Sequence, residues 1–191
     1  EGYGTTECVT ASCLTPKDYA RSGSIGVPFP DVYYKVGAPG TTEEQESNVE
    51  GEICVSGPTV MLGYMDNPEE TANTLRLHGD GRVWLHTGDM AQQDEDGFIF
   101  LVDRKKDVII SGGENLYPVQ IESFLAAHPK IHDVAVIGLP DKRLGEIAAA
   151  IIQVKEGYTC TEEQINRYCR KLPRYKRPRK IIFAEVPRNP T

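Results

Sequence analysis

The charge of this chain changes sign near residue 104. Residues 1–104 carry 6 Lys and Arg against 18 Asp and Glu, a balance of −12, whereas residues 105–191 carry 15 against 10, a balance of +5. The local patterns change at the same place: turn-forming Gly and Pro separate short strand patterns before it, while helical and strand patterns alternate after it. A chain of 191 residues can form one large or two small domains. The sequence therefore predicts an α+β protein, with β-rich residues 1–104 followed by a small α+β domain at 105–191.

Capping signals place the helices. Asn67 is expected to cap a helix that runs to about Leu77, with Pro in its first position and Glu70 completing a capping box. Thr161 and Gln164 form the same signature for a later helix. Hydrophobic patterns predict the other elements: strands at residues 52–56, 98–102, 108–110, 134–138, 148–154 and 181–183, and a helix between residues 118 and 129.

A glycine-bearing phrase, GYGTTE, occupies residues 2–7. Its glycines let a ligand approach the backbone closely. Tyr3 offers a ring for stacking on a base, and the hydroxyls of Thr5 and Thr6 can donate to a phosphate. Glu7 supplies a hard oxygen ligand suited to Mg²⁺. These six residues alone are equally compatible with a Gly-rich turn that carries an incidental acid.

Three more phrases follow in order. LHTGD, residues 85–89, places Asp89 just after a Gly turn, where it either accepts hydrogen bonds from ribose hydroxyls or simply forms the turn. DRKKD, residues 103–107, is either a solvated linker or a charged, exposed hinge. SGGEN, residues 111–115, lies between a strand pattern and a helix pattern, so its glycines either approach a narrow ligand or make a β-turn.

About 80 residues separate GYGTTE from LHTGD, and about 15 separate LHTGD from DRKKD, which runs on into SGGEN. In this order the phrases resemble the acyl-adenylate-forming enzymes, the superfamily of acyl-CoA synthetases, luciferases and peptide-synthetase adenylation domains. The resemblance implies ATP (with AMP as product) and Mg²⁺ as cofactors. It implies that Tyr3 stacks on adenine, Thr6 contacts the α-phosphate and Glu7 binds Mg²⁺. Asp89 would bind the ribose. The full set that it assigns to the nucleotide is Tyr3, Gly4, Thr5, Thr6, Asp89 and Arg104.

The same resemblance gives the later phrases a role in the second half of a two-step reaction. Lys106 would be the pivot about which a small mobile C-terminal domain rotates. Gly112 and Gly113, with Asn115, would line the tunnel for the pantetheine arm of coenzyme A. Residues 167–180 hold eight basic side chains, which would lie near the phosphates of the CoA nucleotide or form a solvated helix face and loop.

The implied activity is that of an AMP-forming acid–thiol ligase acting on a carboxylic acid, with a medium- or long-chain fatty acid expected. Residues 1–104 would be the β-rich end of the large adenylating domain, and residues 105–191 most of the C-terminal domain. The phosphate loop of relatives lies upstream and their catalytic Lys just downstream, so this fragment alone is expected to be inactive. Two alternatives remain: an adenylating enzyme that loads a carrier protein, and a non-catalytic nucleotide-binding module.

Composition argues against several other classes. No apolar run reaches about 18 residues, and the first residues lack the pattern of a signal peptide, so no transmembrane segment is expected. Neither the five Cys nor the four His show metal-ligand spacing, which predicts reduced thiols in a cytoplasmic protein. Tyr side chains interleave with the basic residues at 167–180, as in some nucleic-acid sites, but the net charge of −7 argues against nucleic acid as a partner.

Overall fold

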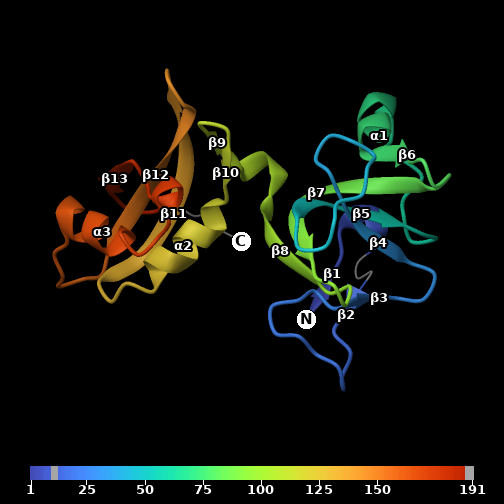
Figure 1. Cartoon of the computed structure of the whole chain (residues 1–191), viewed down its shortest axis with the longest axis horizontal. Helices are drawn as coiled ribbons and strands as arrows, with labels where there is room; N and C mark the ends of the chain where they lie inside the picture. Colours follow the sequence, from blue (N-terminus) through green and yellow to red (C-terminus); the bar gives the residue numbers. More distant parts are fainter. Residues whose placement is uncertain (10–12, 188–191) are drawn as a thin grey trace. The chain divides into compact units, whose positions relative to one another are not determined.

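The computed structural model describes residues 1–9 and 13–187. The chain divides into two compact units, Glu1–Lys105 and Lys106–Thr191, one residue later than the division expected from the sequence. Figure 1 shows both units in the colours of the sequence. Strands and helices occur in each unit, which confirms the α+β class.

The first unit is built on a five-stranded antiparallel sheet. Its strands are ordered β4-β5-β7-β6, and β8 pairs with the other part of the long strand β7. A smaller antiparallel sheet has the order β1-β2-β3. The strands are β1 (Gly2–Tyr3), β2 (Cys13–Leu14), β3 (Val27–Pro28), β4 (Tyr33–Gly37), β5 (Glu50–Ser56), β6 (Leu75–Leu77), β7 (Val83–Gln93) and β8 (Ile99–Arg104).

Strand β5 is the centre of this unit. Six of its seven residues are buried, because β4 and β7 flank it on both edges. Ile53 and Val55 pack with Val36 of β4 and Leu85 of β7 in one hydrophobic core. Burial of each such side chain contributes roughly 1.5–3 kcal/mol, so β5 fixes the position of whatever polar residues it carries.

Helix α1 (Pro68–Thr74) begins as expected and ends early. The side chain of Asn67 accepts a hydrogen bond from the backbone N–H of Glu70 at 3.1 Å. The prediction that the helix continues to Leu77 is wrong, since residues 75–77 form strand β6 and pair with β7. Pairing along the edge of the sheet satisfies their backbone groups and takes precedence over the helical pattern.

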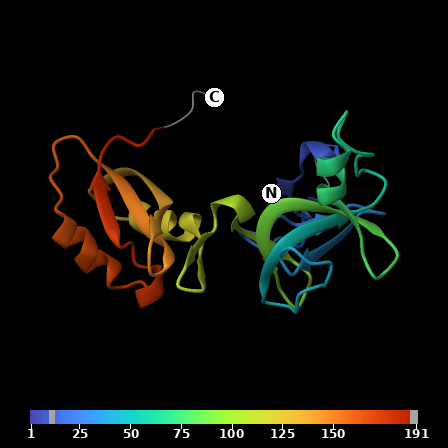
Figure 2. The ribbon, with the colours of Figure 1, turned by 90° about the horizontal axis from the view of Figure 1, so that it is seen from above.

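The second unit is one five-stranded sheet covered by two helices. The strands are β9 (Ile109–Ser111), β10 (Glu114–Leu116), β11 (Ile131–Asp141), β12 (Gly145–Val154) and β13 (Lys180–Phe183), in the order β10-β9-β12-β11 with β13 parallel to β12. The helices α2 (Pro118–Ala126) and α3 (Glu162–Cys169) pack against the long β11–β12 hairpin (Figures 1 and 2).

The core of the second unit is formed by apolar residues that recur on one face of each helix and of strand β12. Ile121 and Leu125 of α2 and Ile165 of α3 are fully buried against alternate residues of β12, among them Ala150 and Ile152. Alternate strand residues share a face, so both helices cover the same side of the sheet. The predicted capping box at the start of α3 is present, with hydrogen bonds in both directions between Thr161 and Gln164.

Candidate active site

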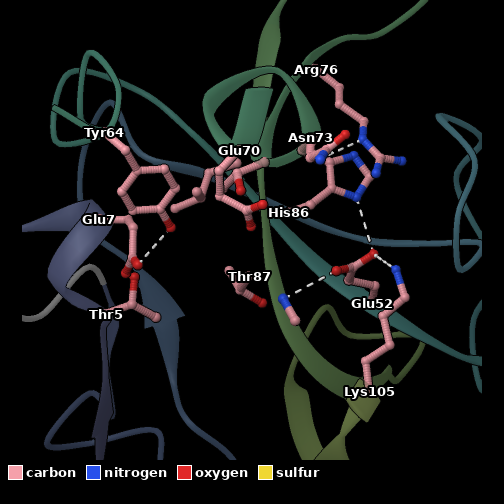
Figure 3. Close-up of a pocket in the computed structure, with 13 residues that line it drawn as sticks. Thr5, Glu7, Glu52, Tyr64, Glu70, Asn73, Arg76, His86, Thr87 and Lys105 are labelled. Carbon is pink, nitrogen blue, oxygen red and sulfur yellow. Dashed lines mark hydrogen bonds and ion pairs between the residues drawn. The ribbon is translucent and has the colours of Figure 1, made fainter. Parts of the chain in front are cut away.

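A polar cavity of about 310 Å³ lies in the first unit (Figure 3). Two groups of side chains line it on opposite sides. Glu7 and Tyr64 form one group, and Glu52, His86 and Lys105 form the other. Elements far apart in the sequence therefore meet around one polar space, which is the usual setting of a small-molecule site.

Glu7 lies in the short 3₁₀ helix η1 (Thr6–Cys8) that follows β1. The hydroxyl of Tyr64 donates a hydrogen bond to Oε1 of Glu7 at 2.9 Å. Burial alone would raise the pKa of Glu7, but hydrogen bonds from its own backbone N–H, Tyr64 and Thr5 outweigh burial and lower it. The carboxylate is therefore charged at neutral pH and directed at the cavity, as a ligand for a hard cation must be.

The rest of the first phrase surrounds Glu7. Thr5 also lines the cavity, and its hydroxyl lies 3.5 Å from Sγ of the buried Cys8. Gly4 and Thr6 are exposed. Residues 2–7 therefore run from the end of β1 into η1, with Gly4, Thr5 and Thr6 accessible to a ligand.

Asp89 does not follow a turn, contrary to the expectation from its neighbouring Gly. It lies inside the eleven-residue strand β7. Gly88 has φ of +75°, and the β5–β7 register shifts between Glu52 and Cys54, so the strand bulges at this point. A bulge redirects side chains without ending the strand. Thr87 fixes it by donating to the carbonyl of Ile53 at 2.9 Å.

The bulge brings three of the predicted nucleotide residues together. The hydroxyl of Tyr3 donates to Oδ2 of Asp89 at 2.6 Å, and Nε of Arg104 lies 3.3 Å from Oδ1. Burial and the hydrogen bond to Asp89 raise the pKa of Tyr3, which keeps its hydroxyl protonated as a donor. The ring of Tyr3 packs edge-on against Tyr34, with 6.3 Å between centroids. Tyr3, which lies 86 positions before Asp89, thus joins Asp89 and Arg104 in one polar cluster.

Glu52 organises the opposite side of the cavity, and the sequence analysis missed it. Its Oε1 accepts from the backbone N–H of Gly88 at 3.0 Å. Its Oε2 lies 3.1 Å from Nδ1 of His86 and accepts from Nζ of Lys105 at 2.8 Å. Burial alone would raise the pKa of Glu52, but the bonds to His86 and Lys105 outweigh burial and lower it to about 2. The carboxylate therefore ties β5 to the bulge of β7 and to the residue after Arg104.

The other missed residues have weak signals in the sequence. Nothing in the sequence around Tyr64 indicates that its hydroxyl reaches Glu7. Cys and His spacing predicted no metal-ligand group, yet ligand atoms of Cys54, His78 and His86 lie within 4.8 Å of one another. Both contacts join segments of the chain that only the fold brings together.

The remaining predicted residues belong to the second unit. Lys106 is exposed in the 3₁₀ helix η2 (Lys105–Asp107). Gly112 and Gly113 have φ of +63° and +88° and form the turn of the β9–β10 hairpin, in agreement with the β-turn that was one of the two alternatives for SGGEN. Asn115 is exposed in β10 and pairs with Ile110 of β9.

The basic stretch at residues 167–180 covers the end of α3 and η3 (Arg174–Lys176). Most of its cationic side chains are exposed. Arg177 donates to the carbonyls of Leu172 and Arg170, Lys176 donates to Gln120 at 2.6 Å, and Nζ of Lys171 lies 4.9 Å from the ring centroid of Tyr168. In the part of the chain that the structure describes, no helix is long and apolar enough to span a membrane.

Known families match both units. Residues 1–65 match the AMP-binding enzymes, and residues 120–191 match the AMP-binding enzyme C-terminal domain. The chain belongs to the AMP-binding enzyme superfamily. This confirms the resemblance drawn from the four phrases.

Curated relatives within this superfamily are acid–thiol ligases. The chain is 41% identical over 192 residues to a long-chain-fatty-acid–CoA ligase of Escherichia coli, covering 99% of this chain and 33% of that protein. It is 41% identical over 191 residues to a 2-succinylbenzoate–CoA ligase of Bacillus mycoides, covering 98% and 38%. The chain thus spans about a third of the length of the relatives that it matches.

Solved structures of the superfamily have the same fold. ATP-bound MatB from Rhodopseudomonas palustris has a TM-score of 0.89 and 37% identity, with 99% of this chain and 37% of that chain covered. The o-succinylbenzoate coenzyme A synthetase of Bacillus subtilis, in complex with ATP and magnesium ion, has a TM-score of 0.82 and 33% identity, with 99% and 38% covered.

Proposed function

We propose that these residues are part of an AMP-forming acyl-CoA synthetase. In the complete enzyme, a carboxylate oxygen attacks the α-phosphorus of ATP, giving an acyl adenylate and expelling pyrophosphate. The thiol of CoA then loses its proton and attacks the acyl carbon. The bond between that carbon and the phosphate oxygen breaks, and AMP leaves with the electron pair on this oxygen. The observation that carries this proposal is the contact of Asp89 with both Tyr3 and Arg104. The residues next to Asp89 and Arg104 in the chain, Gly88 and Lys105, line the cavity that also holds the charged Glu7.

The nucleotide would bind across the first unit. Tyr3 is proposed to stack on adenine with the part of its ring that the hydrophobic core leaves accessible, since the residue is 9% exposed. Asp89 is proposed to accept from the ribose hydroxyls. Arg104 adds a cation next to Asp89. Both oxygens of Asp89 are engaged within the protein, by Tyr3 and Arg104. A ribose must therefore share or displace these partners, which ties nucleotide binding to the position of the Arg104 side chain.

The residues of the first phrase fit a phosphate with its cation. Gly4 allows close approach, while Thr5 and Thr6 provide hydroxyl donors for the α-phosphate. Glu7 fits Mg²⁺ because it is a charged oxygen ligand at the edge of the cavity, held in place by Tyr64. The ion, when bound, neutralises phosphate charge as pyrophosphate leaves.

The second unit would serve thioester formation. Lys106 is proposed as the hinge, because it is an exposed residue at the junction of two compact units. The turn at Gly112 and Gly113, with Asn115 beside it, is proposed to line the path of the pantetheine arm. The exposed cations at 167–180 suit the phosphates of the CoA nucleotide.

The acid is proposed to be a medium- or long-chain fatty acid. Ligases for fatty acids and for succinylbenzoate are equally similar to this chain, at 41% identity. An acid panel is therefore the direct test. The complete enzyme is supplied with ATP, Mg²⁺, CoA and each of a series of fatty and aromatic acids, and acyl-CoA and AMP are measured. Equal amounts of both products with a fatty acid support the proposal; thioester formed on a carrier protein but not on CoA contradicts it.

The hinge is tested by separating the two steps. Proline fixes φ and removes the backbone donor, so Lys106→Pro restricts rotation at this position. We expect acyl-adenylate formation to be preserved and thioester formation to fall at least tenfold in the complete enzyme. Lys106→Ala, which keeps backbone freedom, is the matched control. Equal loss in both steps with Lys106→Pro would refute the hinge assignment.

A further inference from the structure

One Cys and two His form a buried cluster that the proposed reaction does not use. Cys54 of β5 and His86 of β7 are paired across the two strands, and His78 follows β6. The exposed fractions of the three residues are 0%, 7% and 4% in that order. We call Cys54, His78 and His86 the Cys–His cluster; their ligand atoms lie within 4.8 Å of one another.

The distances approach those around a tetrahedral cation. Nε2 of His78 lies 2.9 Å from Nε2 of His86, and Sγ of Cys54 lies 4.0 Å from the same Nε2 of His86. Bonds of about 2.05 Å to nitrogen and 2.3 Å to sulfur would place two nitrogens about 3.3 Å apart and sulfur about 3.6 Å from nitrogen. These two separations each differ from that geometry by roughly 0.4 Å. Sγ of Cys54 also lies 3.8 Å from Nδ1 of His86, so the Cys54 side chain must rotate toward Nε2 for the three ligand atoms to share one ion.

Glu52 orients one imidazole for such a cation. An ionised carboxylate only accepts hydrogen bonds, so the Nδ1 of His86, 3.1 Å from Oε2 of Glu52, carries the ring proton. The Nε2 of His86 then presents its lone pair to His78. Metal-ligating His commonly donates its other N–H to a carboxylate, which fixes the ring and raises its basicity. The Cys–His cluster thus has a carboxylate behind its first imidazole.

The protons of His78 and Cys54 can be rearranged so that all three side chains bind a cation. In the metal-free pair, Nε2–H of His78 donates to Nε2 of His86. On binding, that proton moves to Nδ1 of His78, a buried atom without a hydrogen-bond partner among the described residues. The thiol of Cys54 loses its proton to solvent, because a coordinating thiol is deprotonated by the metal.

Carboxylates balance two of the nearby cationic side chains: Lys105 is paired with Glu52, and Lys35 is paired with Asp80 at 3.4 Å. The third, Arg76, lines the same cavity as His86 and donates from Nε to the carbonyl of Asn73 at 2.8 Å. His86 lines the polar cavity, which gives a path from solvent.

We infer that the Cys–His cluster binds a thiophilic transition-metal cation of the Zn²⁺ class, with three protein ligands and one position for water. One thiolate and two imidazoles suit Zn²⁺ and its substitute Co²⁺, whereas Mg²⁺ prefers oxygen. The site is separate from the proposed Mg²⁺ ligand Glu7, and the inference does not rest on the proposed function.

Co²⁺ spectroscopy on the reduced 191-residue chain tests the inference. Wild-type protein is expected to show a thiolate-to-cobalt charge-transfer band and tetrahedral d–d bands, both removed by one equivalent of Zn²⁺. X-ray absorption of the zinc form should give one sulfur at about 2.3 Å and two nitrogens at about 2.0–2.1 Å. Absence of a charge-transfer band in folded, reduced wild-type protein would overturn the inference.

Variants assign the ligands. Cys54→Ala should abolish the charge-transfer band, and His78→Gln should weaken Zn²⁺ binding at least tenfold while keeping the thiol. Cys169→Ala is the matched control, because Cys169 is an equally buried thiol in the second unit and should leave the band unchanged. Glu52→Gln should weaken Zn²⁺ about tenfold, the usual cost of losing a carboxylate behind a ligating His. A band that persists in Cys54→Ala places the metal elsewhere and contradicts the assignment; should that variant fail to fold, the His78→Gln titration and the wild-type absorption data still decide.

Discussion

Replacement of Glu52 by Gln tests the electrostatic organisation of the site. Both carboxylate oxygens face donors: Oε1 faces the N–H of Gly88, and Oε2 faces His86 and Lys105. An amide has one oxygen and one NH₂ group. Whichever way the Gln side chain turns, its NH₂ meets a donor, so the variant loses the negative charge and at least one hydrogen bond.

The structure sets the size of the effect. The lowering of the pKa of Glu52 from 4.5 to about 2 corresponds to roughly 3 kcal/mol of preference for the charged form in the folded state. The side chain is only 3% exposed, so solvent screening is weak. A pKa lowered by folding gives stability that is fully present above pH 4.5 and is lost as the pH falls toward 2. We therefore expect Glu52→Gln to lower the free energy of unfolding of the first unit by about 3 kcal/mol at pH 7, and by less than half of that at pH 3.

Urea unfolding followed by tryptophan fluorescence measures this. Trp84 is the single tryptophan of the chain and is buried in β7, so its emission reports on the first unit alone. Glu50→Gln is the matched control, because it removes the same charge from the same strand without affecting the bonds of Glu52. A loss below 1 kcal/mol at pH 7, or a loss independent of pH between 7 and 3, would refute the account of Glu52.

Three further predictions concern backbone, cap and cavity. Gly26→Ala should destabilise the first unit by more than about 3 kcal/mol in the same urea assay, because φ is +93° and the added Cβ would lie 2.2 Å from a backbone carbon of β2. The control Gly23→Ala, with φ of +82° and no atom within 4 Å of the added Cβ, should cost only about 1–2 kcal/mol. Equal losses in the two variants would contradict the steric argument. Thr161→Ala should lower the free energy of unfolding of the second unit by about 1 kcal/mol, measured by circular dichroism, because it removes the capping box of α3; no change would contradict the role of the cap. Tyr64→Phe should raise the pKa of Glu7, followed by NMR titration of its carboxyl carbon, because one of the hydrogen bonds that lower this pKa is lost; an unchanged pKa would show that Tyr64 does not act on Glu7.

Local sequence signals predicted the elements whose stability is itself local. The Asn67 and Thr161 caps are present because each side chain satisfies a backbone donor three residues further along, in the first turn of the helix. The end of α1 was wrong, since Leu75 and its neighbours gain more from pairing with β7 than from another helical turn. Long-range pairing of this kind leaves no trace in a window of ten residues.

The candidate site shows the same limit. Its chemistry-bearing phrases could be read from the chain because they are contiguous, and Tyr3 does meet Asp89. Glu52 and the Cys–His cluster could not, because their partners lie on neighbouring strands and the β5–β7 bulge sets the register between them. The sequence also placed Asp89 after a turn, where only the pairing of both flanks reveals one continuous strand.

The most direct test of the proposed function is acid-dependent exchange of pyrophosphate into ATP by the complete enzyme. Exchange reports acyl-adenylate formation without the thiol step. We expect exchange that requires a carboxylic acid, is supported by fatty acids, and falls at least a hundredfold with Asp89→Ala, which removes the proposed ribose acceptor. Folded enzyme that shows no exchange with any fatty or aromatic acid, or exchange unaffected by Asp89→Ala, would contradict it.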